Sequence, residues 1–322
     1  NRFTPNKLAV IPNTATTATM FAVVIPILTS IKNAKARSGV ALAIPLAANV
    51  GGIATPVGTP PNAIAVGALE SNGIHVSFID WMIMATPFAA LILIASWLLL
   101  CTLFIPRSER IELTMDTNWN MSGKAKIFYA VAALTITLWM TEPLHGVSSN
   151  TVGFIPVAAL LCLRVMDGSD IKKLDWPVLW LVSGGIALGT GIGATGLDAW
   201  LVGSIGWQAL GAVGVTLVLC LVGLGFANVM SHSAASNLLV PVAISLAISL
   251  DGINTTTIAV VVAIACSLGM SLPISTPPNA IAYSTGTCTV KDMAILGIIV
   301  GIASTLLLAL AMPPLWELMG LV

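Results

Sequence analysis

A seven-residue string containing two adjacent prolines occurs twice in this chain. Thr-Pro-Pro-Asn-Ala-Ile-Ala stands at residues 59–65 and again at residues 276–282. Adjacent prolines remove backbone donors and end a helix, and each proline pushes the residue before it toward extended geometry. Each copy therefore predicts a short unwound segment whose carbonyls face the interior. Carbonyl and side-chain oxygens suit a hard cation such as sodium, whereas helix N-termini at such breaks suit carboxylates.

A polar segment precedes each copy at a similar distance. Residues 13–19 and 231–237 are both rich in serine, threonine and asparagine. The distance to the threonine of the motif is 46 positions counted from Asn13 and 44 positions counted from His232. The two halves of the chain therefore share one plan, in which each polar segment is the tip of a helical hairpin.

The composition places both motifs in a membrane. Hydrophobic residues make up 57% of the chain and charged residues 8%, with a mean hydropathy of +0.98, whereas soluble domains carry roughly a quarter charged residues. Lipid is therefore the main solvent. The 13 basic and 13 acidic residues balance, so nothing suggests nucleic-acid binding. The five cysteines have no metal-binding or disulfide spacing and are interpreted as buried, reduced thiols.

Stretches without charged residues define the expected spans. A helix crosses a membrane with about 20 apolar residues, and 81–106 and 293–316 each fit one span. Residues 38–69 and 252–290 are too long for one span and too short for two. Each contains a copy of the motif and predicts a helix broken in mid-membrane, which is tolerated only around a polar cavity or inside protein. Residues 199–250 predict a re-entrant hairpin.

The basic residues predict how the chain is oriented. They cluster in 32–37, 107–126 and 164–173 and are absent from 70–80 and 142–150, which places the former inside and the C-terminus outside. The two copies then have opposite orientations, as in transporters whose binding site lies between inverted repeats. The predicted fold class is an all-α polytopic membrane protein with inverted structural repeats, re-entrant hairpins and discontinuous helices.

The repeat also gives an expectation about the N-terminus. The second unit has about 105 residues between Lys126 and its hairpin tip, whereas the first has 12 residues before Asn13. We therefore expect the chain to be truncated at the N-terminus by roughly 90 to 100 residues, the length of a few helices.

Other residues carry weaker expectations. The glycine-rich run 183–196 lacks the Lys-Ser/Thr of a phosphate loop, so it predicts close helix packing. Glu142 is expected to be solvated at the end of a span, and His75 and His145 to lie in loops without partners.

The duplicated motif and the polar tips resemble those of the divalent anion/sodium symporter family, which includes bacterial sodium-dicarboxylate carriers. That family carries two Ser-Asn-Thr hairpin tips and two Thr-Pro motifs at unwound helices. The resemblance covers essentially the whole chain and implies a scaffold, a transport domain that moves as an elevator, and a homodimer. The matching segments here are Pro12-Asn13-Thr14, Gly58-Thr59-Pro60, Ser231-His232-Ser233 and Ser275-Thr276-Pro277.

The resemblance also implies a division of roles. Residues 1–70 and 176–291 would be the transport-domain elements of the two repeats, 71–175 scaffold spans with a cytoplasmic linker, and 292–322 the last scaffold span. The residues that would bind sodium are Asn13, Gly58, Ser231, His232 and Ser275. The residues that would surround a dicarboxylate are Asn13, Thr14, Thr59, Pro60, Ser233, Thr276 and Pro277.

Two tip residues differ from the family pattern. Pro12 stands where the family has serine and removes a hydroxyl oxygen from one sodium site. His232 stands where the family has asparagine, and a protonated imidazole there would replace a sodium ion and pair with the substrate. A neutral His232 would instead bond through one nitrogen, as asparagine does. Both readings stay open, so sodium-independent exchange is an alternative to symport.

The sequence as a whole predicts a secondary active transporter of the inner membrane. It would carry C4-dicarboxylates such as succinate, malate or fumarate with sodium as coupling ion and no cofactor. Sodium is favoured over protons because neither motif has an acidic neighbour. A sodium-independent exchanger and a passive anion channel are the alternatives. An enzyme is not expected, because the chain has no HExxH, no GxSxG and no paired intramembrane Asp.

Overall fold

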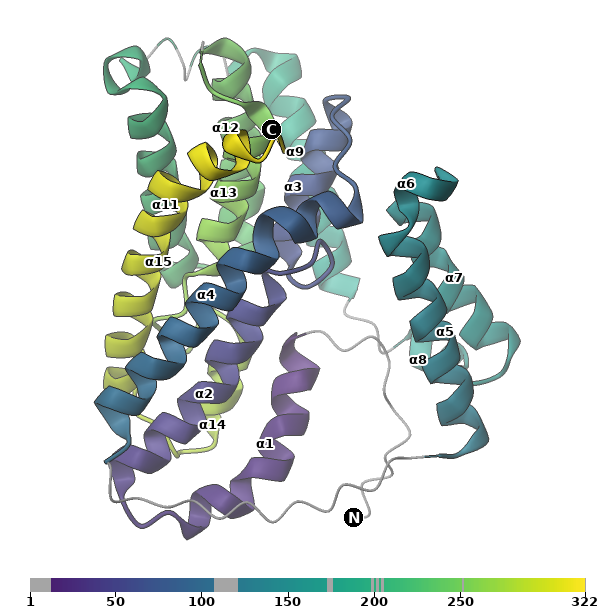
Figure 1. The fold of residues 1–322 in the computed structure, drawn as a ribbon, viewed down its shortest axis with the longest axis vertical. Helices are drawn as coiled ribbons and strands as arrows, with labels where there is room; N and C mark the ends of the chain where they lie inside the picture. The colour runs from purple at the N-terminus through teal and green to yellow at the C-terminus, as the bar shows by residue number, and fades with distance from the viewer. Residues whose placement is uncertain are drawn as a thin grey trace.

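Helices are the regular elements throughout the part of the chain that is described (Figure 1). The computed structural model describes residues 13–106, 121–172, 176–197, 200, 203, 206–250 and 252–321. This confirms the predicted all-α class. The elements are α1 (Asn13–Ser30), α2 (Ala34–Gly52), α3 (Pro60–Ser71), α4 (Phe78–Phe104), α5 (Gly123–Met140), α6 (Glu142–His145), α7 (Ser149–Cys162), α8 (Gly168–Ile171), α9 (Trp176–Thr195), η1 (Trp207–Leu210), α11 (Gly211–Val229), α12 (His232–Ser249), α13 (Thr255–Ser267), α14 (Pro277–Ser284) and α15 (Val290–Leu318).

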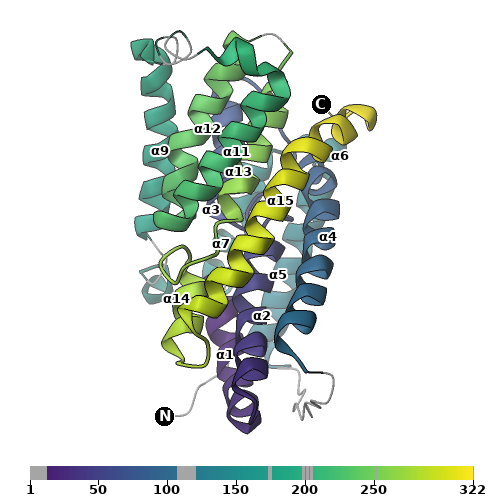
Figure 2. The same cartoon turned by 90° about the vertical axis from the view of Figure 1, so that its left-hand side faces the viewer.

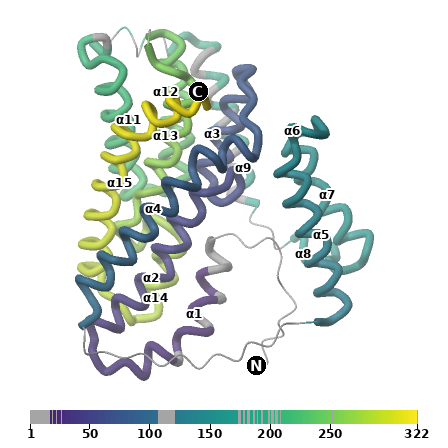
Figure 3. The backbone as a smooth tube through the Cα atoms, in the orientation of Figure 1, coloured from purple at the N-terminus to yellow at the C-terminus, as the bar shows by residue number. Residues whose placement is uncertain are grey.

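Four of these helices, α4, α11, α12 and α15, are long and apolar enough to cross a membrane. The helices α7 and α13 are apolar but shorter. The two stretches that the sequence predicts as single spans coincide with α4 and α15. The tube in Figure 3 shows these two helices running past one another along the length of the molecule.

Both predicted helix breaks are present. Residues 53–59 separate α2 from α3, and residues 268–276 separate α13 from α14. The threonine before each proline is extended, with φ −137° and ψ 150° at Thr59 and φ −142° and ψ 149° at Thr276. This is the geometry that a following proline imposes. The prolines then open the next helix at positions where a missing N–H costs nothing.

The elements around the two breaks pack in corresponding pairs. Helix α1 packs against α2 and α14, and its counterpart α12 packs against α13 and α3. In the same way α2 packs against α4, α13 packs against α15, and α4 contacts α15. In Figures 1 and 2, α1 and α2 lie toward one end of the molecule and α12 and α13 toward the other. An inverted repeat requires this pairing, and the direction in which each copy faces a membrane stays a prediction.

The second broken helix forms the centre of the fold. Every residue of α13 from Thr257 to Ser267 is buried, and α3, α11, α12 and α15 pack around it. A helix that is apolar on all sides is stable only when other elements surround it. The start of the break that follows α13 is buried with it, since Leu268, Met270 and Ser271 are at most 5% exposed, whereas Ile274 near its end is 69% exposed.

The predicted second hairpin turns within its polar segment. Helix α11 ends at Val229 and α12 begins at His232, with Ser231 as the N-cap. The Ser231 hydroxyl accepts a hydrogen bond from the Ala234 N–H at 3.1 Å. Because the cap fixes where α12 begins, the tip residues occupy defined places at the helix N-terminus.

The helices α5, α6 and α7 join α4 through Glu142. Its carboxylate is 5% exposed and accepts the Phe78 N–H and the Ser149 N–H, each at 3.2 Å, and also the Ser149 hydroxyl. The His75 Nε2 lies 3.2 Å from Glu142 Oε1. The Phe78 ring stacks on Trp139 with centroids 4.7 Å apart. The expectations that Glu142 is solvated and that His75 has no partner are therefore wrong.

The expectation for His145 is wrong as well. Its Nε2 lies 2.8 Å from the Leu138 carbonyl oxygen, and its Nδ1 accepts the Val147 N–H at 3.0 Å. The physical reason is shared with Glu142. A short connection that folds back on itself leaves backbone groups without helical partners, and nearby side chains satisfy them.

The contacts of Glu142 make its charge a stabilising feature. Burial raises the pKa of this carboxyl, whereas the bonds from Ser149 and Phe78 and the nearby His75 lower it, and the net result is below the ordinary value of 4.5. A carboxyl with a depressed pKa in the folded state stabilises the fold above its unfolded pKa. That contribution is lost as the pH falls through the folded pKa.

We predict that Glu142→Gln lowers the free energy of unfolding at neutral pH by about 2 kcal/mol, the worth of a charged hydrogen-bond acceptor. Thermal unfolding in detergent measures this loss. As the pH falls below 4.5, the wild type should lose the stability that the Glu142 carboxylate contributes and that the variant already lacks. The two plots of stability against pH should therefore converge. The control is Glu70→Gln, because Glu70 is exposed and has one hydrogen bond, from Asn150 at 2.9 Å, and a longer contact of 3.9 Å with His75. Parallel pH profiles for wild type and Glu142→Gln would contradict the prediction.

Candidate functional site

The second hairpin tip is bonded directly to the second helix break. His232 Nε2 lies 2.7 Å from the Gly269 carbonyl oxygen. Asn228 Oδ1 accepts the Ser271 N–H at 2.8 Å, and the Asn228 carbonyl accepts the Ser275 hydroxyl at 3.1 Å. The structure thus brings His232 and Ser275, two of the expected sodium ligands, to the contact between tip and break. Asn228 joins the two segments, and the sequence analysis gave it no role.

The other two residues of this tip differ in exposure. Ser231 is exposed and caps α12, whereas Ser233 in the first turn is 8% exposed. The first turn of an 18-residue helix presents unsatisfied N–H groups and partial positive charge. An anion is therefore favoured at this end of α12.

The bond to Gly269 determines which nitrogen of His232 carries a hydrogen. A carbonyl oxygen only accepts, so Nε2 must donate to it. The amide of glutamine reaches as far as Nε2 and could donate the same bond. The Nδ1 atom then offers a lone pair when the ring is neutral and a second N–H when it is protonated. The geometry is compatible with both roles that the sequence leaves open for His232.

The asparagine of each motif satisfies the carbonyls of its own break. Asn62 Nδ2 lies 3.0 Å from the Gly52 oxygen, 3.3 Å from the Ile53 oxygen and 2.8 Å from the Thr55 oxygen. The expected open carbonyls of the break are therefore bonded to protein donors, because an unpaired buried carbonyl is costly. The Ile53 oxygen also accepts from Trp81 Nε1 at 3.0 Å and the Thr55 oxygen from the Gly58 N–H at 3.1 Å, so both lone pairs of these two oxygens are already used. The corresponding bonds in the second break run from Asn279 Nδ2 to the oxygens of Met270 at 2.8 Å and Leu272 at 3.1 Å.

Gly58 lies where the two sides of the first break touch. A Cβ atom placed on it would stand 2.2 Å from the Gly52 carbonyl oxygen, closer than any real contact. Its N–H bonds to the Thr55 carbonyl at 3.1 Å. In the second break, a Cβ on Gly269 would meet Ala227 at 2.5 Å. These two glycines are therefore required by close approach of protein backbone.

Each motif threonine bonds to the broken helix of the other copy. Thr59 Oγ1 lies 3.2 Å from Ser267 Oγ at the end of α13. Thr276 Oγ1 accepts from Asn49 Nδ2 at 3.3 Å, and Asn49 belongs to α2. Sequence reasoning missed both Ser267 and Asn49. A lone amide inside the apolar stretch 39–52 of α2 was the available sign for Asn49, whereas Ser267 gave none.

The remaining expected site residues are placed only in part. Pro60 and Pro277 open α3 and α14 at the breaks. Pro12 lies outside the described residues, and so do the side chains of Asn13 and Thr14, so the role of the first tip stays a prediction. The helix that carries Asn13 and Thr14, α1, packs against α14.

The glycine-rich run lies on α9, which packs against α12 and α3. A Cβ on Gly185 would stand 1.7 Å from Asn237 Oδ1. Gly184 and Gly191 have nothing within 4 Å of such an atom. The prediction of close helix packing is confirmed at Gly185, which lets α9 approach α12.

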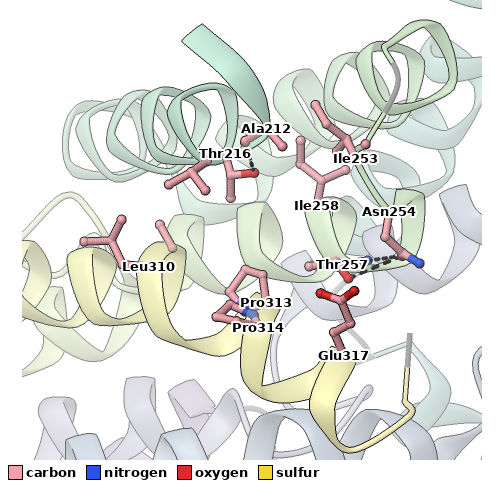
Figure 4. Close-up of a pocket in the computed structure, with 13 residues that line it drawn as sticks. Ala212, Thr216, Ile253, Asn254, Thr257, Ile258, Leu310, Pro313, Pro314 and Glu317 are labelled. Atoms are coloured by element: carbon pink, nitrogen blue, oxygen red, sulfur yellow. Dashed lines mark hydrogen bonds between the residues drawn. The ribbon is translucent and has the colours of Figure 1, made fainter.

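A separate cavity of about 340 Å³ lies between α11, α13 and α15. Figure 4 shows the Glu317 carboxylate pointing toward Thr257 and Asn254, beside the Pro313-Pro314 turn of α15. None of the expected sodium or dicarboxylate residues lines this cavity. It is thus distinct from the clusters at the two breaks.

Comparison with known proteins agrees with this geometry. A family model described as the sodium:sulfate symporter transmembrane region matches residues 62–322. The chain belongs to this family. The match confirms the resemblance to divalent anion/sodium symporters, and the four helices long and apolar enough to cross a membrane agree with a multi-pass membrane protein.

Similar curated proteins come from several strains of Staphylococcus aureus. In strains USA300, NCTC 8325 and COL, the sodium-dependent dicarboxylate transporter SdcS is 28% identical to this chain over 307 residues. The match covers 86% of this chain and 58% of each relative. The chain therefore spans less than two thirds of the length of these transporters.

We predict that Gly58→Ala lowers the free energy of unfolding by about 3 kcal/mol, because its methyl group would overlap the Gly52 carbonyl and force the backbone to shift. Gly51→Ala is the matched control, since a Cβ there has nothing within 4 Å. It should change stability by less than about 1 kcal/mol. Thermal unfolding in detergent compares the two, and equal losses would refute the argument from close approach.

Proposed function

We propose that this chain is the membrane-embedded body of a secondary active transporter that moves C4-dicarboxylates across the cytoplasmic membrane together with sodium. The observation that carries the proposal is the pair of helix breaks whose carbonyls are hydrogen-bonded by an asparagine side chain. The second break is also bonded to a hairpin tip through Asn228, His232 and Ser275. Family membership and the similarity to the sodium-dependent dicarboxylate transporter SdcS support the same conclusion.

The chemistry of the breaks favours an anion with a hard cation. The expected site residues whose side chains are described, His232 apart, are neutral and carry hydroxyl groups or proline rings. The helices α3, α12 and α14 begin at these residues, and their N-termini attract carboxylates. Ser231 and Ser275 supply hydroxyl oxygen atoms for sodium. A carboxylate and a sodium ion side by side neutralise each other, which lowers the cost of burying both.

The scaffold helices α4 and α15 pack against α2, α11 and α13 of the proposed transport domain. The elements assigned to it contact each other across the two copies, α1 and α2 with α14, and α3 with α9, α12 and α13. The elements assigned to the scaffold, α4, α5, α7 and α15, are joined by α4 to α5, α5 to α7 and α4 to α15. We infer an elevator motion of residues 1–70 and 176–291 against 71–175 and 292–322, in a homodimer whose C-termini face outside.

One observation favours a second candidate, sodium-independent dicarboxylate exchange. His232 is 9% exposed and donates through Nε2, which leaves Nδ1 to be protonated or to act as a ligand. A doubly protonated ring would supply the positive charge that sodium otherwise brings. The two candidates therefore differ in what sits beside the substrate at the second tip.

We predict that proteoliposomes containing the protein expressed from its complete reading frame accumulate succinate when sodium is present outside, and that replacing sodium by choline lowers uptake at least about tenfold. The reason is that a doubly charged anion without its cations must be buried uncompensated. Counterflow from succinate-loaded vesicles gives the control for intact protein. Equal accumulation in choline would reject symport and favour exchange.

We predict that His232→Gln keeps the bond to Gly269, because the amide nitrogen of glutamine reaches about as far as the Nε2 atom of histidine, and removes the titratable ring. If His232 serves only as a neutral donor, sodium dependence should change by less than about twofold. If its charge replaces an ion, the variant should gain sodium dependence. Uptake against sodium concentration, measured at two pH values for both proteins, separates these outcomes. His145→Gln is the control, since His145 is exposed and lies outside the tip.

A further inference from the structure

The two amide hydrogens of Asn279 are committed to backbone carbonyls. Its Nδ2 lies 2.8 Å from the Met270 oxygen and 3.1 Å from the Leu272 oxygen. Carbonyl oxygens only accept, so the amide nitrogen of Asn279 must face them. The Oδ1 atom then faces the opposite way, toward α2.

This orientation determines the orientation of Asn49. Asn49 Nδ2 lies 3.2 Å from Asn279 Oδ1 and 3.3 Å from Thr276 Oγ1. Because Asn279 presents an acceptor, Asn49 must present its amide nitrogen, and its second hydrogen goes to Thr276. The three side chains are 2% to 4% exposed. Water therefore has little access with which to replace any of these bonds.

The Thr276 hydroxyl can form one more hydrogen bond, and only by donating its hydrogen. A hydroxyl group has two lone pairs and one hydrogen. One lone pair accepts from Asn49, and the other accepts the Asn279 N–H at 3.2 Å. The hydroxyl can therefore act toward a ligand only as a donor, and the ligand atom it meets must be an acceptor such as a carboxylate oxygen.

Thr59, at the same place in the other copy, has the opposite arrangement. Ser267 Oγ donates its one hydrogen to the Ala263 carbonyl at 3.3 Å. In the contact between Ser267 and Thr59, the hydrogen must then come from Thr59. The lone pairs of Thr59 remain, so this hydroxyl faces a ligand as an acceptor. Two identical motifs thus present unlike groups.

We propose that Asn49 is a positioning residue that holds the Thr276 hydroxyl as an obligate donor to one carboxylate of the substrate. The identity of that substrate rests on the proposed function, whereas the donor role follows from the hydrogen-bond network. Asn49 makes no contact with the substrate in this proposal and acts through Thr276.

The test is a double-mutant cycle on the protein in liposomes. Asn49→Leu should raise the KM for succinate about fivefold, because the freed hydroxyl rotates among several partners, and Thr276→Val should raise it about tenfold, the effect of about 1.4 kcal/mol. The maximal rate and the half-saturating sodium concentration should stay within about twofold. The double variant should be no worse than Thr276→Val alone, because the two residues act as one unit.

A second variant covers the case in which Asn49→Leu does not fold. Asn49→Ala removes the donor without adding bulk or charge, so the Thr276 hydroxyl is freed in the same way and the KM should rise as in Asn49→Leu. Thr276→Ser keeps the hydroxyl and should keep the wild-type KM. The control is Thr305→Val, which removes a buried hydroxyl on α15 that has no hydrogen-bond partner among the described residues. It should leave the KM unchanged.

The outcomes separate the inference from the proposed function. An unchanged KM in folded Asn49→Leu, or effects of the two single variants that multiply in the double variant, would overturn the role of Asn49. If the wild type neither transports nor is stabilised by succinate, the proposed substrate is wrong. The same cycle is then measured as sulfate-induced thermal stabilisation, since sulfate oxygens are also acceptors, and the same non-additivity is expected.

Discussion

The bonds from buried asparagine amides to backbone carbonyls are what allow helices to be interrupted inside this protein. The breaks between α2 and α3 and between α13 and α14 leave carbonyls without helical partners, and in an apolar interior each such group is costly. Asn62 and Asn279 supply the missing donors within their own segments. The fourth residue of the motif is therefore as necessary as the prolines, which explains why Thr-Pro-Pro-Asn is duplicated as a unit.

The same bonds connect local backbone geometry to the arrangement of the two halves. Because Asn279 is fixed by the carbonyls of its own break, it presents an acceptor to Asn49 on the other broken helix. The breaks are then held by each other as well as by the hairpin tip, which contacts the second break through Asn228 and His232. Hydrogen bonds between side chains and unwound backbone give the described part of the site its shape.

The sequence predicts features that are encoded locally and misses features that depend on distant partners. Adjacent prolines and the absence of charge located both breaks and the turn before α12, because those constraints act within a few residues. Asn49 and Ser267 were missed because their importance comes from threonines more than two hundred positions away. Glu142 was misjudged for the same reason, since its buried partner Phe78 belongs to another helix.

The two copies of the motif have the same sequence but different neighbours, and this difference matters for an anion with two charged ends. The Thr276 hydroxyl has both lone pairs occupied and can only donate, whereas Thr59 gives its hydrogen to Ser267 and keeps its lone pairs. A carboxylate meets a donor at Thr276 directly, but at Thr59 it meets another acceptor and is repelled unless a cation or a proton lies between them. If the proposed dicarboxylate contacts both threonines, the hydroxyl environment at the first break gives a physical reason for a coupling ion, even though the second tip has a histidine in place of asparagine.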